Sequence, residues 1–281
     1  MDQFPPDSVI RRVNIEPAIM LGAGRALVLQ LAHPSVAQGV EDHSDFKGNP
    51  FKRLQGTLEA TYAAVFGRED LARDVGARIQ WIHDFVTGPD YRANDVTNLL
   101  WVHATLCDTA LRAYTTLVEP LSPRDEETYY EEMTRVAELF GVPRSDQPTT
   151  LRDFRAYMAD TLSQVRVTKT GVALTRFVLD PTLPFQLHVP LRPLLALQRR
   201  FTLGTLPPEI RNQLGVEWSA RDQQRFDATE RRVRAIFRAT PRALRTAPTR
   251  AAGPLLLWQA ERHVRQWDLR RRIRTPATPT R

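Results

Sequence analysis

The features that would place this 281-residue chain in several familiar protein classes are rare or missing. Its single cysteine, Cys107, excludes a disulfide framework within the chain and a cysteine-based zinc knuckle, and we expect it to be a small core residue. No run of about 18 or more apolar residues occurs, which excludes a spanning helix. The N-terminal stretch MDQFPPDSVIRRVNIEP holds prolines and acids but no apolar segment, unlike a secretory signal. We therefore expect a soluble, cytoplasmic protein.

Lysine is also scarce, since only Lys47, Lys52 and Lys169 occur among 39 basic residues. The arginine excess is local: residues 221–281 hold 16 arginines and 5 acids, so the rest of the chain is slightly acidic. A basic tail such as RRRIRTPATPTR can hold a nucleic acid or an anionic membrane loosely. We favour a solvated helix end with a disordered tail, expect no specific nucleic-acid partner, and keep weak peripheral membrane contact as an expectation.

Helical periodicity dominates the chain, because apolar residues recur three and four positions apart along most of it. No strand pattern is convincing and no internal repeat occurs. We therefore expect an all-α domain over 1–245 with a basic helix and tail over 246–281. Residues 178–193 hold four prolines and predict a linker or an extended crossing. The predicted helices cover residues 18–32, 51–66, 70–87, 95–118, 125–140, 150–165, 193–203, 207–214, 219–238 and 253–272.

Several catalytic and cofactor motifs are excluded by what is missing from them. The string GAGRAL over 22–27 begins like a dinucleotide fingerprint, but it lacks the third glycine and no strand precedes it. No Glu-x-x-His occurs, which excludes the usual carboxylate-bridged di-iron bundle. The run from Glu41 to Asp45 resembles a metal site only superficially, because consecutive residues on a turn do not easily converge on one ion.

Three histidines are predicted to face inward. His83 lies four residues after Ile79 on the apolar face of its predicted helix, His103 shares a face with apolar neighbours by the same spacing, and His33 ends the apolar face of the first helix. A buried imidazole needs a hydrogen-bond partner or a metal on one nitrogen. Each of these histidines alone is best explained as a core residue whose ring nitrogens have hydrogen-bond partners. Three on separate helices favour a haem pocket, which requires one proximal histidine.

At these positions the sequence resembles a known oxygenase family. The strings LGAGRALVLQLAHPSVAQGVEDHSDF, RLQGT, IHDFV, YRANDVTNLLWVHATLCDTAL and DEETYYEEMTRVAELFGVP are similar to those of bacterial latex-clearing (rubber) oxygenases and the fungal mycophenolic-acid B-type oxygenase. The similarity covers roughly residues 10–245. The segments LLWVHATLCDTALRAY and DEETYYEEMTRVAELFGV are especially similar to the rubber oxygenases, whereas Leu-Ala-His-Pro with Asp-His-Ser is more like the short bacterial members. The resemblance implies a globin-like helical core, haem b, and cleavage of a carbon–carbon double bond by dioxygen.

On the proximal side, the resemblance implies that His83 ligates the haem iron. The rubber oxygenases carry an Arg-x-x-His helix motif there, but Gln80 replaces the arginine and the nearest arginine is Arg78. This departure keeps His103 and His33 open as rival ligands. His103 matches an inward histidine of the family, which implies that it orients groups around the site.

On the distal side, the resemblance places the family's arginine and threonine on Arg53 and Thr57, and a shifted register would use Thr61 instead. Both side chains would donate hydrogen bonds to dioxygen as negative charge builds on it. Gly56 stands where some rubber oxygenases have a lysine. Glu59 lies about 200° around the helix from Thr57, so we expect it to face solvent rather than to act as a base. The substrate route is expected to run under residues 181–193.

The function implied by the resemblance is a haem b-dependent oxygenase that uses dioxygen on an apolar alkene or isoprenoid-like substrate. Two other classes stay open. A non-catalytic haem or gas-binding protein would keep His83 without a substrate channel, and a helical interaction module would use the arginine-rich C-terminus without haem. An absorption spectrum separates the last class from the first two. The sequence leaves the oligomeric state open.

Overall fold

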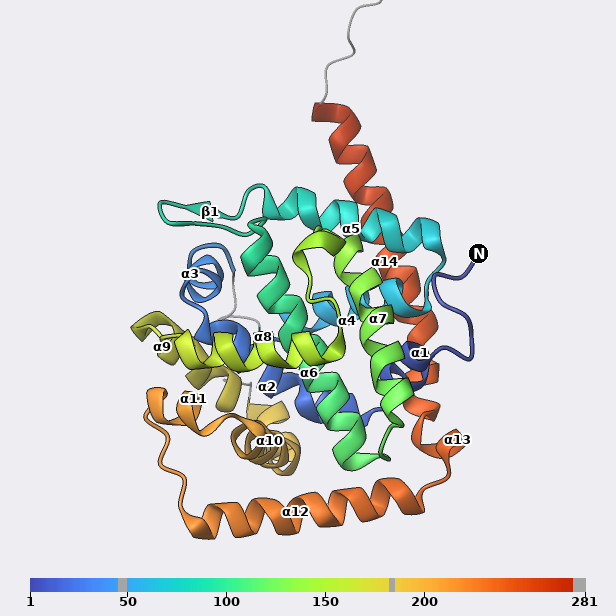
Figure 1. Cartoon of the computed structure of the whole chain (residues 1–281). Helices are drawn as coiled ribbons and strands as arrows, with labels where there is room; N and C mark the ends of the chain where they lie inside the picture. The colour runs from blue at the N-terminus through green and yellow to red at the C-terminus, as the bar shows by residue number, and fades with distance from the viewer. Residues whose placement is uncertain (45–49, 182–184, 275–281) are drawn as a thin grey trace, which may run out of the picture.

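The computed structural model describes residues 1–44, 50–181 and 185–274, with side chains over 1–44, 55–181 and 189–271. It is an all-α fold, as predicted, with one short hairpin of Thr87–Gly88 (β1) and Tyr91–Arg92 (β2) among the described residues (Figure 1). The helices are α1 Val9–Asn14, α2 Ala18–Ala32, α3 Pro34–His43, α4 Pro50–Phe66, α5 Glu69–His83, α6 Val96–Leu117, α7 Pro123–Leu139, α8 Leu151–Gln164, α9 Lys169–Leu179, α10 Phe185–Thr205, α11 Pro208–Gln213, α12 Ala220–Ala239, α13 Arg242–Arg245 and α14 Ala247–Arg274, with a 3₁₀ turn at Arg144–Asp146.

The helix α2 lies at the centre and packs against α6, α9 and α10. Two glycines make these crossings close. A Cβ on Gly22 would stand 2.6 Å from Thr109 Cγ2 of α6, and one on Gly24 would overlap Thr202 Oγ1 of α10. The glycines of GAGRAL therefore serve helix packing rather than a phosphate cradle. Cys107 is buried in the same core, as predicted.

Side-chain caps explain where several helices begin. Ser122, Thr150, Thr168 and Ser219 each accept a hydrogen bond from the backbone N–H three residues later. Each cap satisfies one of the N–H groups that the first turn of a helix leaves unpaired, and each contributes about 1 kcal/mol.

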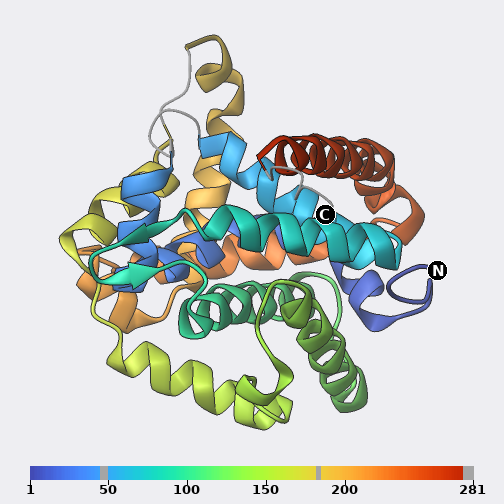
Figure 2. The same cartoon turned by 90° about the horizontal axis from the view of Figure 1, so that it is seen from above.

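The C-terminal helix α14 covers α4 and α5, as Figure 2 shows from above. A second apolar cluster, formed by Ala63, Leu71, Val75, Ala260, Val264 and Trp267, seals this contact. Tyr62 of α4 donates to the Thr249 carbonyl at 3.0 Å, and Gln55 donates to Gln259 at 3.3 Å. The helix thus closes over the bundle, while the division of the chain at residue 245 stays a prediction.

The linker predicted over 178–193 is wrong where the structure describes it. The helix α9 runs to Leu179, and α10 begins at Phe185 and includes Pro190 and Pro193. Both prolines are exposed, so the carbonyl groups that lose their N–H partners can be hydrated. The sequence pattern also missed α1, α3, α9 and α13.

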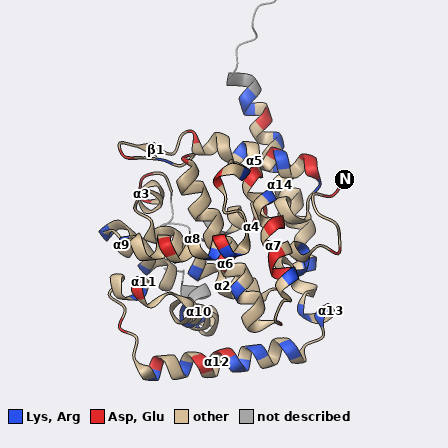
Figure 3. Ribbon diagram, viewed as in Figure 1, with Lys and Arg blue, Asp and Glu red and all other residues tan. Residues whose placement is uncertain are grey.

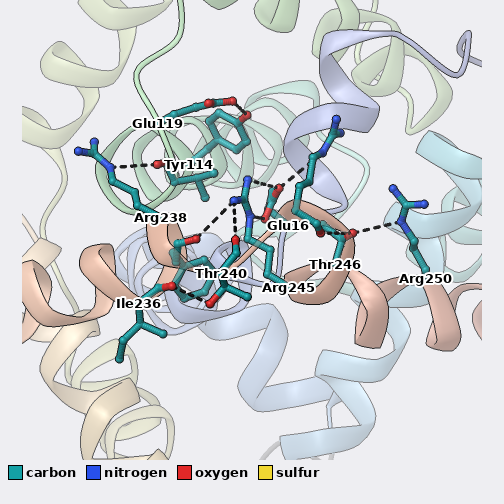
Figure 4. Close-up of polar contacts among 12 residues, drawn as sticks. Glu16, Tyr114, Glu119, Ile236, Arg238, Thr240, Arg245, Thr246 and Arg250 are labelled. Atoms are coloured by element: carbon teal, nitrogen blue, oxygen red, sulfur yellow. Dashed lines mark hydrogen bonds and ion pairs between the residues drawn. The ribbon is translucent and has the colours of Figure 1, made fainter.

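No helix in the described part of the chain is both long and apolar enough to cross a membrane. The helix α12 instead lies across one end of the bundle, and the short α13 joins it to α14 (Figure 1). The buried carboxylate of Glu16 holds α13 through an ion pair with Arg245, drawn in Figure 4.

Candidate functional site

His83 is the last residue of α5, because the chain leaves the helix there and forms the hairpin. The predicted helix over 70–87 is therefore too long. His83 is half-buried with its Nδ1 atom in the buried part, while the preceding Ile82 is 38 % exposed. Seven residues separate His83 from Gly76, so the two share a face of α5 within about 20°. That face packs on α7, since a Cβ on Gly76 would overlap the Leu139 carbonyl. The histidine thus lies on the inner side of α5.

Gln80, at the position where the sequence resemblance predicts an arginine, ties the end of α5 to α7. Its Nε2 donates to the Leu139 carbonyl at 3.1 Å. The amide of Asn94 donates to the Gln80 carbonyl at 2.9 Å and to Asp84 Oδ1 at 2.7 Å. These hydrogen bonds hold the backbone at the end of α5, where His83 lies. Gln80 therefore helps to position His83 through the backbone.

A buried carboxylate links α4, α5 and α14, and it corrects an expectation. Glu59 is 4 % exposed rather than solvent-facing. The Nδ1 atom of His263 on α14 lies 2.9 Å from both carboxylate oxygens, and Arg78 Nη1 lies 4.0 Å from Oε1. Burial lowers the pKa of Arg78, and the Glu59 charge partly offsets this effect. Glu59 does face away from Thr57, as the helix geometry predicts. That face of α4 is covered by α14, and the sequence pattern did not predict this contact.

This arrangement separates Arg78 from the predicted distal threonine. Thr57 lies about 200° from Glu59 on α4, so Arg78 and Thr57 are on different sides of that helix. Thr61 shares the face of Thr57, and so does Ala64, which packs in the main core. Both threonines are half-buried, and the choice between them stays open.

Arg53 lies on α4 one turn before Thr57, but its side chain is outside the described residues. Helix register places positions 53 and 57 on the same face, within about 40° of each other. The pairing of an arginine and a threonine that the resemblance implies is therefore compatible with the backbone of α4.

His33 lies between helices, not on the face of one, because α2 ends at Ala32 and α3 begins at Pro34. Its ring packs against Trp101 of α6 with centroids 6.5 Å apart. The Nδ1 atom is buried and has no hydrogen-bond partner among the described residues. Burial lowers the pKa of His33, so the ring is neutral at neutral pH.

His103 faces a different neighbour. It forms a hydrogen bond with the backbone of Met133 on α7, and burial lowers its pKa to about 4. Trp101 stands two residues earlier on α6 and donates to the Leu29 carbonyl of α2 at 3.0 Å. Because positions two apart lie about 200° apart on a helix, α6 separates His103 from His33.

In the run from Glu41 to Asp45, residues 41–43 end a helix rather than form a turn, since α3 extends to His43, and Asp45 lies outside the described residues. His43 Nε2 lies 3.0 Å from the Thr87 carbonyl of the hairpin, and Tyr91 donates to Asp42 at 2.8 Å. No group of three potential metal ligands gathers in the part of the chain that the structure describes. These polar groups fasten the hairpin to α3.

An apolar groove of about 540 Å³ opens between α2, α9, α10 and α12. Pro181, at the start of the segment predicted to cover the substrate route, lies in its wall. The sequence pattern gave no other sign of the groove, because its walls come from helices far apart in the chain. The principal apolar lining residues are Met20, Leu27, Phe177, Leu194, Ile236 and Phe237.

Comparison with known proteins now identifies the family. Residues 10–235 match the family model described as "ER-bound oxygenase mpaB/B'/Rubber oxygenase, catalytic domain". The chain belongs to this family. The match confirms the resemblance that the motifs indicate, and it includes His33, His83 and His103.

Two relatives match nearly the whole of this oxygenase-family chain. An uncharacterized protein of Mycobacterium bovis and one of Mycobacterium tuberculosis are each 27 % identical to it over 270 residues, which cover 91 % of this chain and 98 % of the relative. No solved structure shows significant similarity. The family match ends within α12, so the contact of Glu59 with His263 joins a matched residue to one beyond the matched range.

Proposed function

We propose that this protein is a haem b-dependent oxygenase that acts with dioxygen on an apolar alkene or isoprenoid-like substrate. The observation that carries the proposal is His83, an inward-facing histidine within the part of the chain that matches an oxygenase catalytic-domain family, at the position that the sequence resemblance identifies with the haem ligand. The apolar groove supports the substrate class.

The residues present fit a haem whose iron is held by His83. Its imidazole lies on the inner face of α5 with Nδ1 buried, and one ring nitrogen would hold the iron while the other forms a hydrogen bond. The bonds of Gln80 and Asn94 hold the end of α5 and would orient the ring. His33 is neutral, with a buried nitrogen that lacks a partner among the described residues, and it is the strongest rival.

When bound, haem would supply the iron that binds and activates dioxygen. Arg53 and Thr57 would contribute hydrogen-bond donors from one face of α4. A single donor of this kind is typically worth on the order of 10²–10³ in rate. The chain's other task is to position an alkene and exclude water.

The groove suits that task because its lining is almost entirely apolar. Burial of a hydrocarbon contributes about 25 cal/mol per Å² of apolar surface removed from water. A protein that only binds a gas needs no groove of about 540 Å³. This favours an organic substrate over the non-catalytic alternative.

Turnover tests the proposal. Protein reconstituted with haem b is incubated with an isoprenoid alkene under oxygen or under argon, and carbonyl products are measured. We expect products only with oxygen, and about 10²–10³-fold slower formation in Arg53→Ala, with the haem band retained. Arg73→Ala, an exposed arginine on α5, is the control and should behave as wild type. Haem-loaded protein without oxygen-dependent products would overturn the catalytic proposal.

A further inference from the structure

The mouth of the apolar groove carries exposed aliphatic side chains from three helices. Met20 of α2 is 36 % exposed, Leu194 of α10 is 54 % exposed and Ile236 of α12 is 63 % exposed, and all three line the groove. Figure 4 shows Ile236 pointing away from the polar cluster around Glu16. A gathering of exposed aliphatic groups at one opening marks an interaction surface more often than scattered single residues do.

Both helices beside this opening carry positive charge. The helix α10 contains no acidic residue, and Arg192, Arg199 and Arg200 are exposed on it. On α12, Arg225, Arg232 and Ile236 follow one another at spacings of seven and four residues, which places them in one stripe. Figure 3 shows the arginines distributed along α12.

The two helices form one face. Arg200 of α10 donates to Thr229 Oγ1 of α12 at 3.1 Å, and the groove lies between α10, α12 and the start of α2. Of the acids on α12, Glu230 pairs with Arg234 on the other flank, Asp227 accepts from Gln223, and Asp222 caps the start of the helix with Ser219. Arg192 and Arg199 lie about 140–160° around α10 from Leu194. The face therefore combines aliphatic side chains at the groove mouth with the arginine stripe of α12.

We propose that this face of α10 and α12 docks on an anionic lipid bilayer, with Leu194 and Ile236 entering the interface. Aliphatic side chains beside an arginine stripe suit the boundary between acyl chains and anionic headgroups, where cations near the surface strengthen binding. A second copy of this chain fits less well, because a two-fold contact would bring like-charged stripes together. A nucleic acid also fits less well, because its charged backbone provides no apolar surface for Leu194 and Ile236 to contact.

The docked face would open the groove toward the bilayer, so an apolar substrate would pass from lipid into the protein without crossing water. This second step rests on the proposed function, whereas the docking itself does not. The surface residues lie in the described part of the chain and need no haem for their contact.

Vesicle co-sedimentation tests the docking, using the full chain with and without haem. The vesicles contain phosphatidylcholine alone or mixed with phosphatidylglycerol. We expect binding to the mixed vesicles that weakens with salt. Ile236→Glu should weaken it about tenfold or more, because one interfacial aliphatic group is lost and a repelled charge is gained. Leu269→Glu on α14 is the matched control, since Leu269 is 62 % exposed and the charge change is identical.

A second pair of variants tests the cations. Arg232→Glu should weaken binding to the mixed vesicles, whereas Arg152→Glu on α8, whose parent side chain is 89 % exposed, should leave it within about twofold. Equal binding by Ile236→Glu and wild type would overturn the proposal, and so would loss of binding only in Leu269→Glu. A dimer in light scattering that Ile236→Glu dissolves would assign the face to a second copy. Vesicle binding by protein that forms no haem band would leave docking intact and refute the oxygenase alone.

Discussion

The ion pair between Glu16 and Arg245 is predicted to hold the C-terminal arm, α12 to α14, on the bundle. Glu16 lies between α1 and α2 and is 1 % exposed. Arg245 Nε lies 2.8 Å from Oε2 and Nη2 lies 3.0 Å from Oε1, a bidentate contact between residues 229 positions apart (Figure 4). Arg242 adds a second cation, with its Nε 3.9 Å from Glu16 Oε1. The hydrogen bond to Glu16 raises the pKa of Arg245.

The size of the expected loss in unfolding free energy follows from the burial of this ion pair. Removal of one partner from a buried pair leaves an uncompensated charge and typically costs about 3–5 kcal/mol. Arg245→Gln should therefore lower the equilibrium constant for folding by roughly two to four orders of magnitude. The double variant with Glu16→Gln should cost clearly less than the two single losses together, because it leaves no buried charge. Arg265→Gln is the control: its partner Glu261 lies 3.6 Å away on an exposed helix turn, so the loss should be about 0.5 kcal/mol or less.

Urea unfolding followed by circular dichroism and tryptophan fluorescence measures these free energies. The expected result is a lower midpoint for Arg245→Gln with an unchanged slope. A loss no larger than that of Arg265→Gln would refute the reasoning. A reduced slope would show that part of the bundle has already detached in the variant, and truncation after residue 240 should then give the same slope.

Three further predictions concern packing, pH and the cover helix. Gly24→Ala should destabilise the protein because its Cβ overlaps Thr202, whereas Gly56→Ala, with open space around it, should stabilise it by about 0.5–1 kcal/mol; both are measured by urea unfolding. Because the His103 pKa is about 4 in the folded protein and about 6.5 unfolded, stability should fall as pH drops from 6.5 to 4, by up to about 1.4 kcal/mol per unit, and His103→Gln should flatten this dependence. Glu59→Gln should speed proteolysis within α14, because it weakens the contact with His263, and an unchanged cleavage rate would contradict this.

The fold could be predicted well from the sequence where the helical spacing of apolar residues and the capping residues at the helix ends agree. The prediction over 18–32 matches α2, and the prediction over 150–165 lies within one residue of α8, whose cap Thr150 precedes a regular apolar stripe. The linker prediction failed because the rule that prolines break helices ignores exposure, and Pro190 and Pro193 are exposed within α10.

The candidate site was harder to predict, because its surroundings come from distant segments. Glu59 is buried by His263, which is 204 positions away, and no local pattern announces that contact. His83 shares the predicted inward face, but the end of α5 depends on the hairpin and on Asn94, so its half-burial could not be derived from spacing. The groove depends on four helices from distant parts of the chain, of which α10 crosses α2 closely at Gly24.

The measurement that tests the central claim most directly is a haem b titration followed by absorption spectroscopy. The account predicts that wild-type protein forms a histidine-ligated band, that His83→Ala loses or strongly distorts it, and that His103→Ala keeps it. Retention of a normal histidine-ligated spectrum in His83→Ala, with loss in His33→Ala, would assign the iron to the rival ligand. Absence of any band in wild-type protein would contradict the oxygenase account itself.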